Sequence, residues 1–104
     1  MELERASLNL KSEDPVVLSS FGVIVAELGR IEEGLRACKS AVSAGANLPL
    51  VHFRLGSILA HQGQIGEAKA SFNAALALEP EFAPALRALA ALSLLKSQTA
   101  KSHL

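Results

Sequence analysis

The sequence predicts an all-α fold, specifically a helical-repeat solenoid of antiparallel helix pairs. Three observations support this prediction. Ala and Leu number 18 each in the 104-residue chain, Val, Ile and Thr together number only 11, and a 34-residue pattern occurs twice. Ala and straight-chain residues lose little rotamer freedom in a helix, whereas β-branched residues lose more. We therefore expect one helical domain over residues 1–104.

The repeat is visible when residues 15–48 are aligned with residues 49–82 without a gap. Nine positions are identical, including a proline that opens each block and two glycines at matching places. The identical pairs are Pro15/Pro49, Val17/Val51, Gly22/Gly56, Ile24/Ile58, Ala26/Ala60, Gly29/Gly63, Ile31/Ile65, Glu33/Glu67 and Ala41/Ala75. A fixed period of this length is typical of a helical hairpin that stacks on its neighbours.

Each block is predicted to contain two helices. The first helices run from Pro15 to Leu28 and from Pro49 to Gln62, and the second helices from Ile31 to Ala44 and from Ile65 to Leu78. All four ranges lie between residues that typically begin or end a helix.

The expected helix ends follow from side-chain chemistry. Asp14 and Asn47 are predicted to cap the first helices of the two blocks, because their side-chain oxygens can accept from free N–H groups. Gly29 and Gly63 are predicted to end these helices, since glycine adopts the left-handed conformation at a helix C-terminus. Pro80 prevents the last of the four helices from continuing.

Small residues within the helices predict close crossings. Gly22 and Gly56 stand mid-helix, where glycine is about 1 kcal/mol less favourable than alanine. We expect the second helix of each block to pass closely at that point. Gly34 and Ala68 are the matching small positions on those second helices.

The second block resembles the tetratricopeptide repeat. The matching residues are Leu55, Gly56, Gly63, Ala68, Phe72, Ala75 and Pro80. The block departs from the family pattern at His52 and Leu59, where the family has Trp and Tyr. The first block is more divergent and retains Gly22, Gly29 and Ala41. The resemblance implies a solenoid whose first helices line a concave face that holds an extended or helical peptide.

The flanking segments continue the same register. Residues 1–14 are predicted as a partial repeat helix, residues 83–98 as a terminal helix and residues 99–104 as a tail. In the terminal helix, Leu86 and Leu89 fall at core positions by analogy with the repeats.

The terminal helix is unusually apolar for the end of a solenoid, because Arg87 and Lys96 are the only charged residues between 83 and 97. Leu92, Leu94 and Leu95 are therefore a candidate surface for oligomer formation. Two alternatives are that the helix belongs to a longer array, and that small Ala patches are simply exposed.

The resemblance also implies which side chains form the concave binding face. They are Val16, Ser19, Ser20, Val23, Ala26, Glu27, Leu50, Phe53, Arg54, Ser57, Ala60, His61, Arg87, Ala91 and Leu94. We expect an apolar groove centred on Phe53, with Val23 and Leu50 adding apolar contact. Arg54 and Arg87 are either anchors for an acidic group or solvated side chains. The Lys and Asn clamp that some relatives use for chaperone C-terminal carboxylates is absent.

Composition and motifs disfavour other classes of function. Ten bases balance ten acids, so the net charge favours neither nucleic acid nor an anionic membrane, and Trp and Tyr are missing as base-stacking platforms. The sequence contains no phosphate-binding loop, and its three histidines do not have metal-ligand spacing. Cys38 falls at a core position and is expected to be a buried, inert thiol. We expect no enzyme activity, no metal and no cofactor.

The predicted function is that of a protein–protein interaction adaptor or scaffold with a protein or peptide partner. One alternative is a self-assembling homo-oligomeric scaffold, because residues 1–33 carry 7 acids and 3 bases while residues 34–104 carry 3 acids and 7 bases. This asymmetry is also compatible with an ordinary fluctuation. A second alternative is the interaction or regulatory segment of a longer enzyme. No signal peptide or membrane-spanning segment is recognisable, so a cytoplasmic location is the default expectation.

Overall fold

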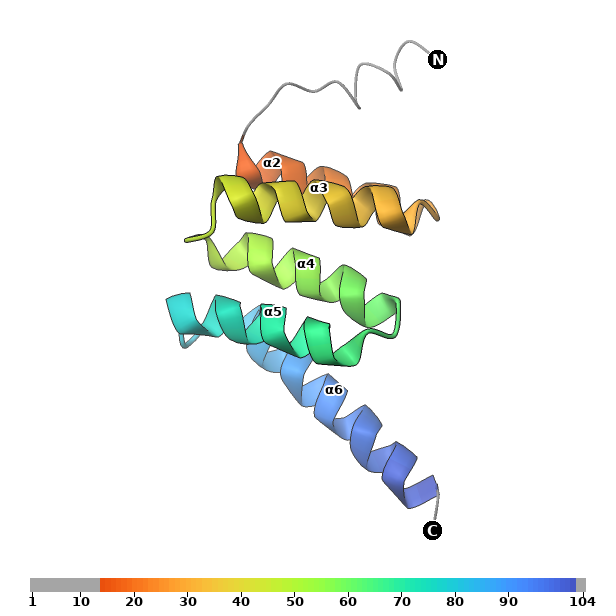
Figure 1. Ribbon diagram of the computed structural model, residues 1–104. Helices are drawn as coiled ribbons and strands as arrows, with labels where there is room; N and C mark the ends of the chain where they lie inside the picture. Colours follow the sequence, from red (N-terminus) through yellow and green to blue (C-terminus); the bar gives the residue numbers. More distant parts are fainter. Residues whose placement is uncertain (1–13, 103–104) are drawn as a thin grey trace.

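The computed structural model describes residues 14–102, with side chains described as far as Leu94. Within this range all regular structure is helical. The helices are α2 (Pro15–Glu27), α3 (Ile31–Ala44), α4 (Pro49–His61), α5 (Ile65–Leu78) and α6 (Ala83–Ser102). They stack as successive antiparallel neighbours, and α6 extends away from α5 at the far end (Figure 1). The helix predicted over 1–14 lies outside the described residues, apart from Asp14.

Most of the predicted helix ends are confirmed. The Asp14 side chain accepts a hydrogen bond from the Val16 N–H at 2.9 Å and so caps α2. Gly29 and Gly63 have φ values of 100° and 85°. These left-handed backbones reverse the chain between α2 and α3 and between α4 and α5, as glycine permits.

The predicted Asn47 cap is wrong. The residue at the cap position of α4 is Leu48, and no side chain caps this helix. Pro49 disfavours helical backbone in the residue before it, so Leu48 is extended and occupies the position that Asp14 has in the first block. Asn47 therefore lies one residue too early to reach the first free N–H groups.

The close crossing of α2 and α3 is confirmed. A Cβ atom added at Gly34 would lie 2.5 Å from the Gly22 carbonyl oxygen and 2.8 Å from the Ala26 Cβ. A Cβ atom at Gly56 would instead meet the Phe72 ring at 2.7 Å, while Ala68 is fully buried. The Phe72 ring therefore fills the space between α4 and α5 at Gly56, whereas the backbones of α2 and α3 come into direct contact at Gly22 and Gly34.

The core runs along the stack between the helix pairs. Its larger part joins α4, α5 and α6 through buried residues that include Leu59, Phe72 and Ala75. Its smaller part joins α2 and α3 to α4 through Ala26, Cys38 and Ile58. Each helix pair thus buries apolar surface against its neighbour, as a solenoid requires.

Helix α6 departs from the prediction in length and in the face it buries. It continues to Ser102, past the predicted end at residue 98. Ala85 and Leu92 are buried and Leu89 packs against them, whereas Leu86 is 47% exposed. Residues 85, 89 and 92 share one helical face, and Leu86 lies about 100° away from it. Leu86 is therefore not a core residue.

The prediction that Leu92 belongs to a surface for oligomer formation is also wrong. Its side chain packs into the core formed with α4 and α5, because it lies on the buried face of α6. Leu94 is 64% exposed. The side chain of Leu95 lies outside the described residues.

Candidate functional site

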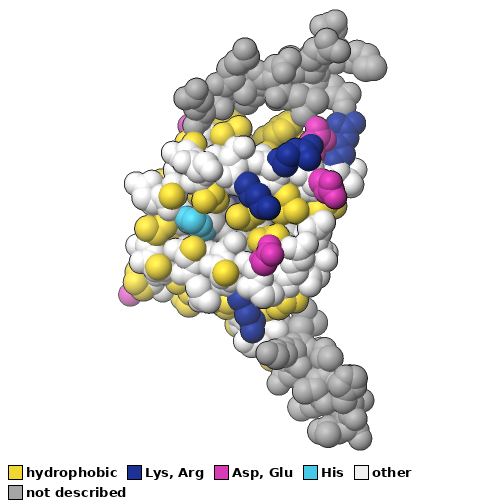
Figure 2. Space-filling model, in the orientation of Figure 1, with side chains coloured by type: hydrophobic (Ala, Val, Ile, Leu, Met, Phe, Trp, Pro, Cys, Tyr) yellow, Lys and Arg dark blue, Asp and Glu magenta, His cyan; other side chains and the backbone are white. Residues whose placement is uncertain are grey.

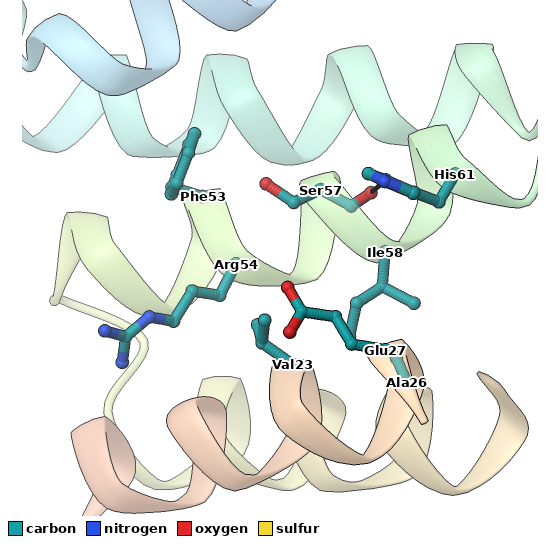
Figure 3. Close-up of a pocket in the computed structure, with 8 residues that line it drawn as sticks. All are labelled: Val23, Ala26, Glu27, Phe53, Arg54, Ser57, Ile58 and His61. Carbon is teal, nitrogen blue, oxygen red and sulfur yellow. Dashed lines mark hydrogen bonds between the residues drawn. The ribbon is translucent and has the colours of Figure 1, made fainter. Parts of the chain in front are cut away.

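A groove lies between α2 and α4, the first helices of the two blocks (Figure 3). It has a volume of about 320 Å³. The lining residues are Val23, Ala26, Glu27, Phe53, Arg54, Ser57, Ile58 and His61. They recur at intervals of three and four residues along each helix, so each helix contributes one stripe of its surface.

The floor of the groove is apolar and firmly packed. Ala26 and Ile58 are 9% and 4% exposed, and both belong to the core that joins α2, α3 and α4. Val23 is half-buried and packs against the same cluster. A floor held from below by core packing is preformed, so a ligand need not order it on binding.

Phe53 forms one wall and is part of an aromatic cluster. Its ring centroid lies 5.7 Å from that of Phe72 and 6.0 Å from that of Phe82. These separations are typical of favourable aromatic pairs. Phe53 is therefore at once a groove residue and a packing residue, so its truncation would disturb both the groove and the core.

Arg54 joins α4 to α2. Its Nη1 lies 2.9 Å from Ser19 Oγ, 2.7 Å from Ser20 Oγ and 3.1 Å from the carbonyl oxygen of Val16. Ser19 is fully buried, and its hydroxyl also donates to the Val16 carbonyl oxygen at 3.0 Å. The sequence left Arg54 open between an anchor for an acidic group and a solvated side chain, and in the structure its guanidinium contacts oxygens of α2.

The end of the groove at the C-termini of α2 and α4 is polar. Helices α2 and α4 run in parallel and end there, at Glu27 and His61. His61 Nδ1 lies 3.0 Å from the carbonyl oxygen of Ser57, while Glu27 is exposed. Figure 3 shows the Glu27 carboxylate directed into the space between the two helices.

The structure brings together a large part of the predicted face. Seven predicted residues line the groove, namely Val23, Ala26, Glu27, Phe53, Arg54, Ser57 and His61. Ser19 is excluded from the surface by its burial. Val16, Leu50 and Arg87 lie outside the groove lining, and Arg87 is exposed on α6. Ile58 was missed, although its identity with Ile24 in the repeat marked it as a structurally constrained apolar position.

A second, shallower hollow is more polar. Its volume is about 250 Å³, and its lining residues are Glu32, Leu35, Arg36, Lys39, Gln62 and Gln64. On the face shown in Figure 2, charged side chains gather near the turn that joins α2 to α3. Leu35 is the one apolar residue in its lining, so the groove between α2 and α4 is the stronger candidate for binding a peptide.

Cys38 is confirmed as a buried thiol. It is fully buried, and its Sγ donates to the Ser19 carbonyl oxygen at 3.7 Å. Burial raises the pKa of Cys38 from 9.0 to about 11, although the Arg54 charge acts in the opposite direction. The thiol therefore stays protonated near neutral pH and lacks the character of a nucleophile.

Two further features are absent from the described part of the chain. Within residues 14–102, no three His, Cys, Asp or Glu side chains are grouped so that they could hold a metal ion. No described helix combines the length and apolar character needed to cross a membrane.

Comparison with known proteins agrees with this architecture. A family model described as "Tetratricopeptide repeat" matches residues 49–82. The sequence of this segment is thus similar to a tetratricopeptide repeat. No curated protein matches the chain.

A solved structure supports the same fold over a longer stretch. It is the first tetratricopeptide domain of Spaghetti (RPAP3), bound to the HSP90 peptide SRMEEVD. The TM-score is 0.73, and the match covers 82% of this chain and 68% of that chain at 21% identity. The predicted all-α solenoid of antiparallel helix pairs is thereby confirmed.

Proposed function

We propose that this chain is a protein-interaction module that holds an apolar segment of a partner protein in the groove between α2 and α4. The observation that carries the proposal is the preformed apolar floor of Val23, Ala26 and Ile58, which opens between two parallel helices. A small apolar hollow bordered by a few polar groups is the usual form of a peptide or ligand site.

The fold and its neighbour support the same conclusion. The RPAP3 domain is a tetratricopeptide domain with a peptide bound. Apolar grooves between helices commonly take up helical or extended segments through a few anchor side chains. Burying one large apolar side chain of the partner would contribute about 1.5–3 kcal/mol, so we expect a few anchors to dominate the affinity.

The test is a variant that fills the groove without disturbing the core. Ser57 lines the groove and is half-buried, so Ser57→Trp would place an indole ring over the apolar floor. We expect at least a tenfold loss of affinity (about 1.4 kcal/mol) for a peptide selected against the wild-type chain from a random display library.

The matched control is Asn73→Trp, which replaces another polar residue by the same ring at an exposed position of α5. Its affinity for the selected peptide, measured by fluorescence anisotropy, should equal that of the wild type. Equal loss in both variants, or loss only in Asn73→Trp, would contradict the groove assignment. Circular dichroism of both variants checks that the helices are intact.

A further inference from the structure

We propose that the partner segment carries a lysine or arginine next to its apolar anchor, and that Glu27 receives this cation at the carboxyl-terminal end of α2 and α4. The inference rests on the proposed function, because it assigns the class of partner to the same groove. It also gives the bound segment a direction along the groove, with its cation at the Glu27 end.

Glu27 supplies the charge that is available to a partner in the groove. Glu27 and Arg54 are the two lining residues with a full charge at neutral pH. The Arg54 guanidinium is held by oxygens of α2, as described above. The Glu27 carboxylate, by contrast, makes no hydrogen bond or ion pair with the side chain or backbone of any other residue in the described range. The groove therefore offers a partner one uncommitted negative charge beside an apolar floor.

The direction of α2 and α4 also favours a cation at this end of the groove. Because α2 ends at Glu27 and α4 ends at His61, both helices present their carboxyl ends at this side of the groove. A helix C-terminus bears a partial negative charge from its aligned carbonyl groups and attracts cations within its last turn. The two helix ends and the Glu27 carboxylate therefore all attract a cation to this end of the groove.

The peptide bound to the structural neighbour is acidic, unlike the segment proposed for this groove. SRMEEVD has three acidic side chains and one basic side chain, in addition to any terminal carboxylate. In this chain the Arg54 charge is engaged by α2, and the opposite end of the groove is negative. Like charges across an interface disfavour association. We therefore expect SRMEEVD to bind this chain more weakly than an apolar segment with an adjacent base.

The experiment is a selection of random displayed peptides on the wild-type chain, on Glu27→Gln and on Glu32→Gln. Glu32→Gln is the matched control, because Glu32 is an exposed acid that lines the other hollow. The pH and ionic strength are the same in all selections and titrations. Synthetic SRMEEVD and the best selected peptide are then titrated against all three proteins.

We expect peptides selected on the wild type and on Glu32→Gln to be enriched in Lys or Arg beside an apolar residue, and those selected on Glu27→Gln to lose the basic residue only. Titration of the best peptide should show about two- to fivefold weaker binding to Glu27→Gln, the range of a partly exposed ion pair. Added salt should reduce this difference.

Enrichment of apolar residues without a base, or a base that persists on Glu27→Gln, would overturn the inference and leave the groove assignment intact. SRMEEVD binding the wild type as tightly as the best selected peptide would also overturn it. Absence of any apolar enrichment on the wild type would contradict the proposed function itself.

Discussion

Gly34 and Gly66 are both helical glycines, but their surroundings differ. A Cβ atom at Gly34 would press on the Gly22 carbonyl oxygen of the facing helix, whereas nothing lies within 4 Å of the corresponding point at Gly66. Backbone cannot move aside as a flexible side chain can. Gly34→Ala must therefore push α2 and α3 apart, while Gly66→Ala adds only helix propensity.

We expect Gly34→Ala to lower the free energy of unfolding by about 1–3 kcal/mol through overpacking. Gly66→Ala should leave it unchanged or raise it by up to about 1 kcal/mol. Urea denaturation followed by circular dichroism measures both changes. A Gly34→Ala variant as stable as Gly66→Ala would show that the α2–α3 crossing is looser than the structure indicates.

The pair α2 and α4 is held together by one long side chain as well as by apolar packing. Arg54 reaches Ser19, Ser20 and the Val16 carbonyl from the neighbouring first helix. These contacts join residues 34 to 38 positions apart and set the position of one groove wall relative to the other. Arg54 is thus a positioning residue for the groove.

We expect Arg54→Met to reduce the free energy of unfolding by about 1–2 kcal/mol, because Ser19 then loses a charged donor while the apolar stem is kept. Amide hydrogen exchange should become faster in the first turns of α2. Arg87→Met, which removes an exposed guanidinium from α6, is the control and should have almost no effect. Equal effects of the two substitutions would contradict the positioning role.

The ends of a helix were predictable where a glycine or proline in the adjoining turn determines the backbone conformation. Ile31–Ala44 and Ile65–Leu78 are observed as expected, because glycines and prolines mark the preceding and following turns. The Arg54–Ser19 contact was not predictable, since Ser19 aligns with Phe53 and Arg54 aligns with Ser20 in the repeat. A contact between different repeat positions leaves no periodic signal in the sequence.

Across the whole molecule, equivalent residues differ in burial according to their neighbours. Val17 and Ile24 on α2 are 37% and 57% exposed, whereas their counterparts Val51 and Ile58 on α4 are 0% and 4% exposed. The same residue types occupy the same helical positions, so the repeat pattern alone predicts equal burial. Ile58 differs because it packs in the cluster that α4 shares with α2 and α3, which is how a solenoid forms its core.

The groove lining was predicted only in part for the same physical reason. Its helices were assigned correctly, and the stripe from Phe53 to His61 lines the groove. The burial of Ser19 and the position of Arg87 outside the groove depend on how the helices rotate against one another. That rotation is set by the Gly22–Gly34 contact and by the aromatic cluster around Phe53, both of which are properties of the assembled stack.

The proposed function places a partner segment in the groove between α2 and α4. The most direct measurement is a titration of the isotope-labelled chain with the selected peptide, followed by ¹H–¹⁵N NMR. We predict that the largest amide shifts fall on groove residues such as Val23, Glu27, Ser57 and His61, and that they are lost in Ser57→Trp. Shifts centred on the hollow around Leu35 and Lys39, with the groove amides unchanged, would contradict the claim.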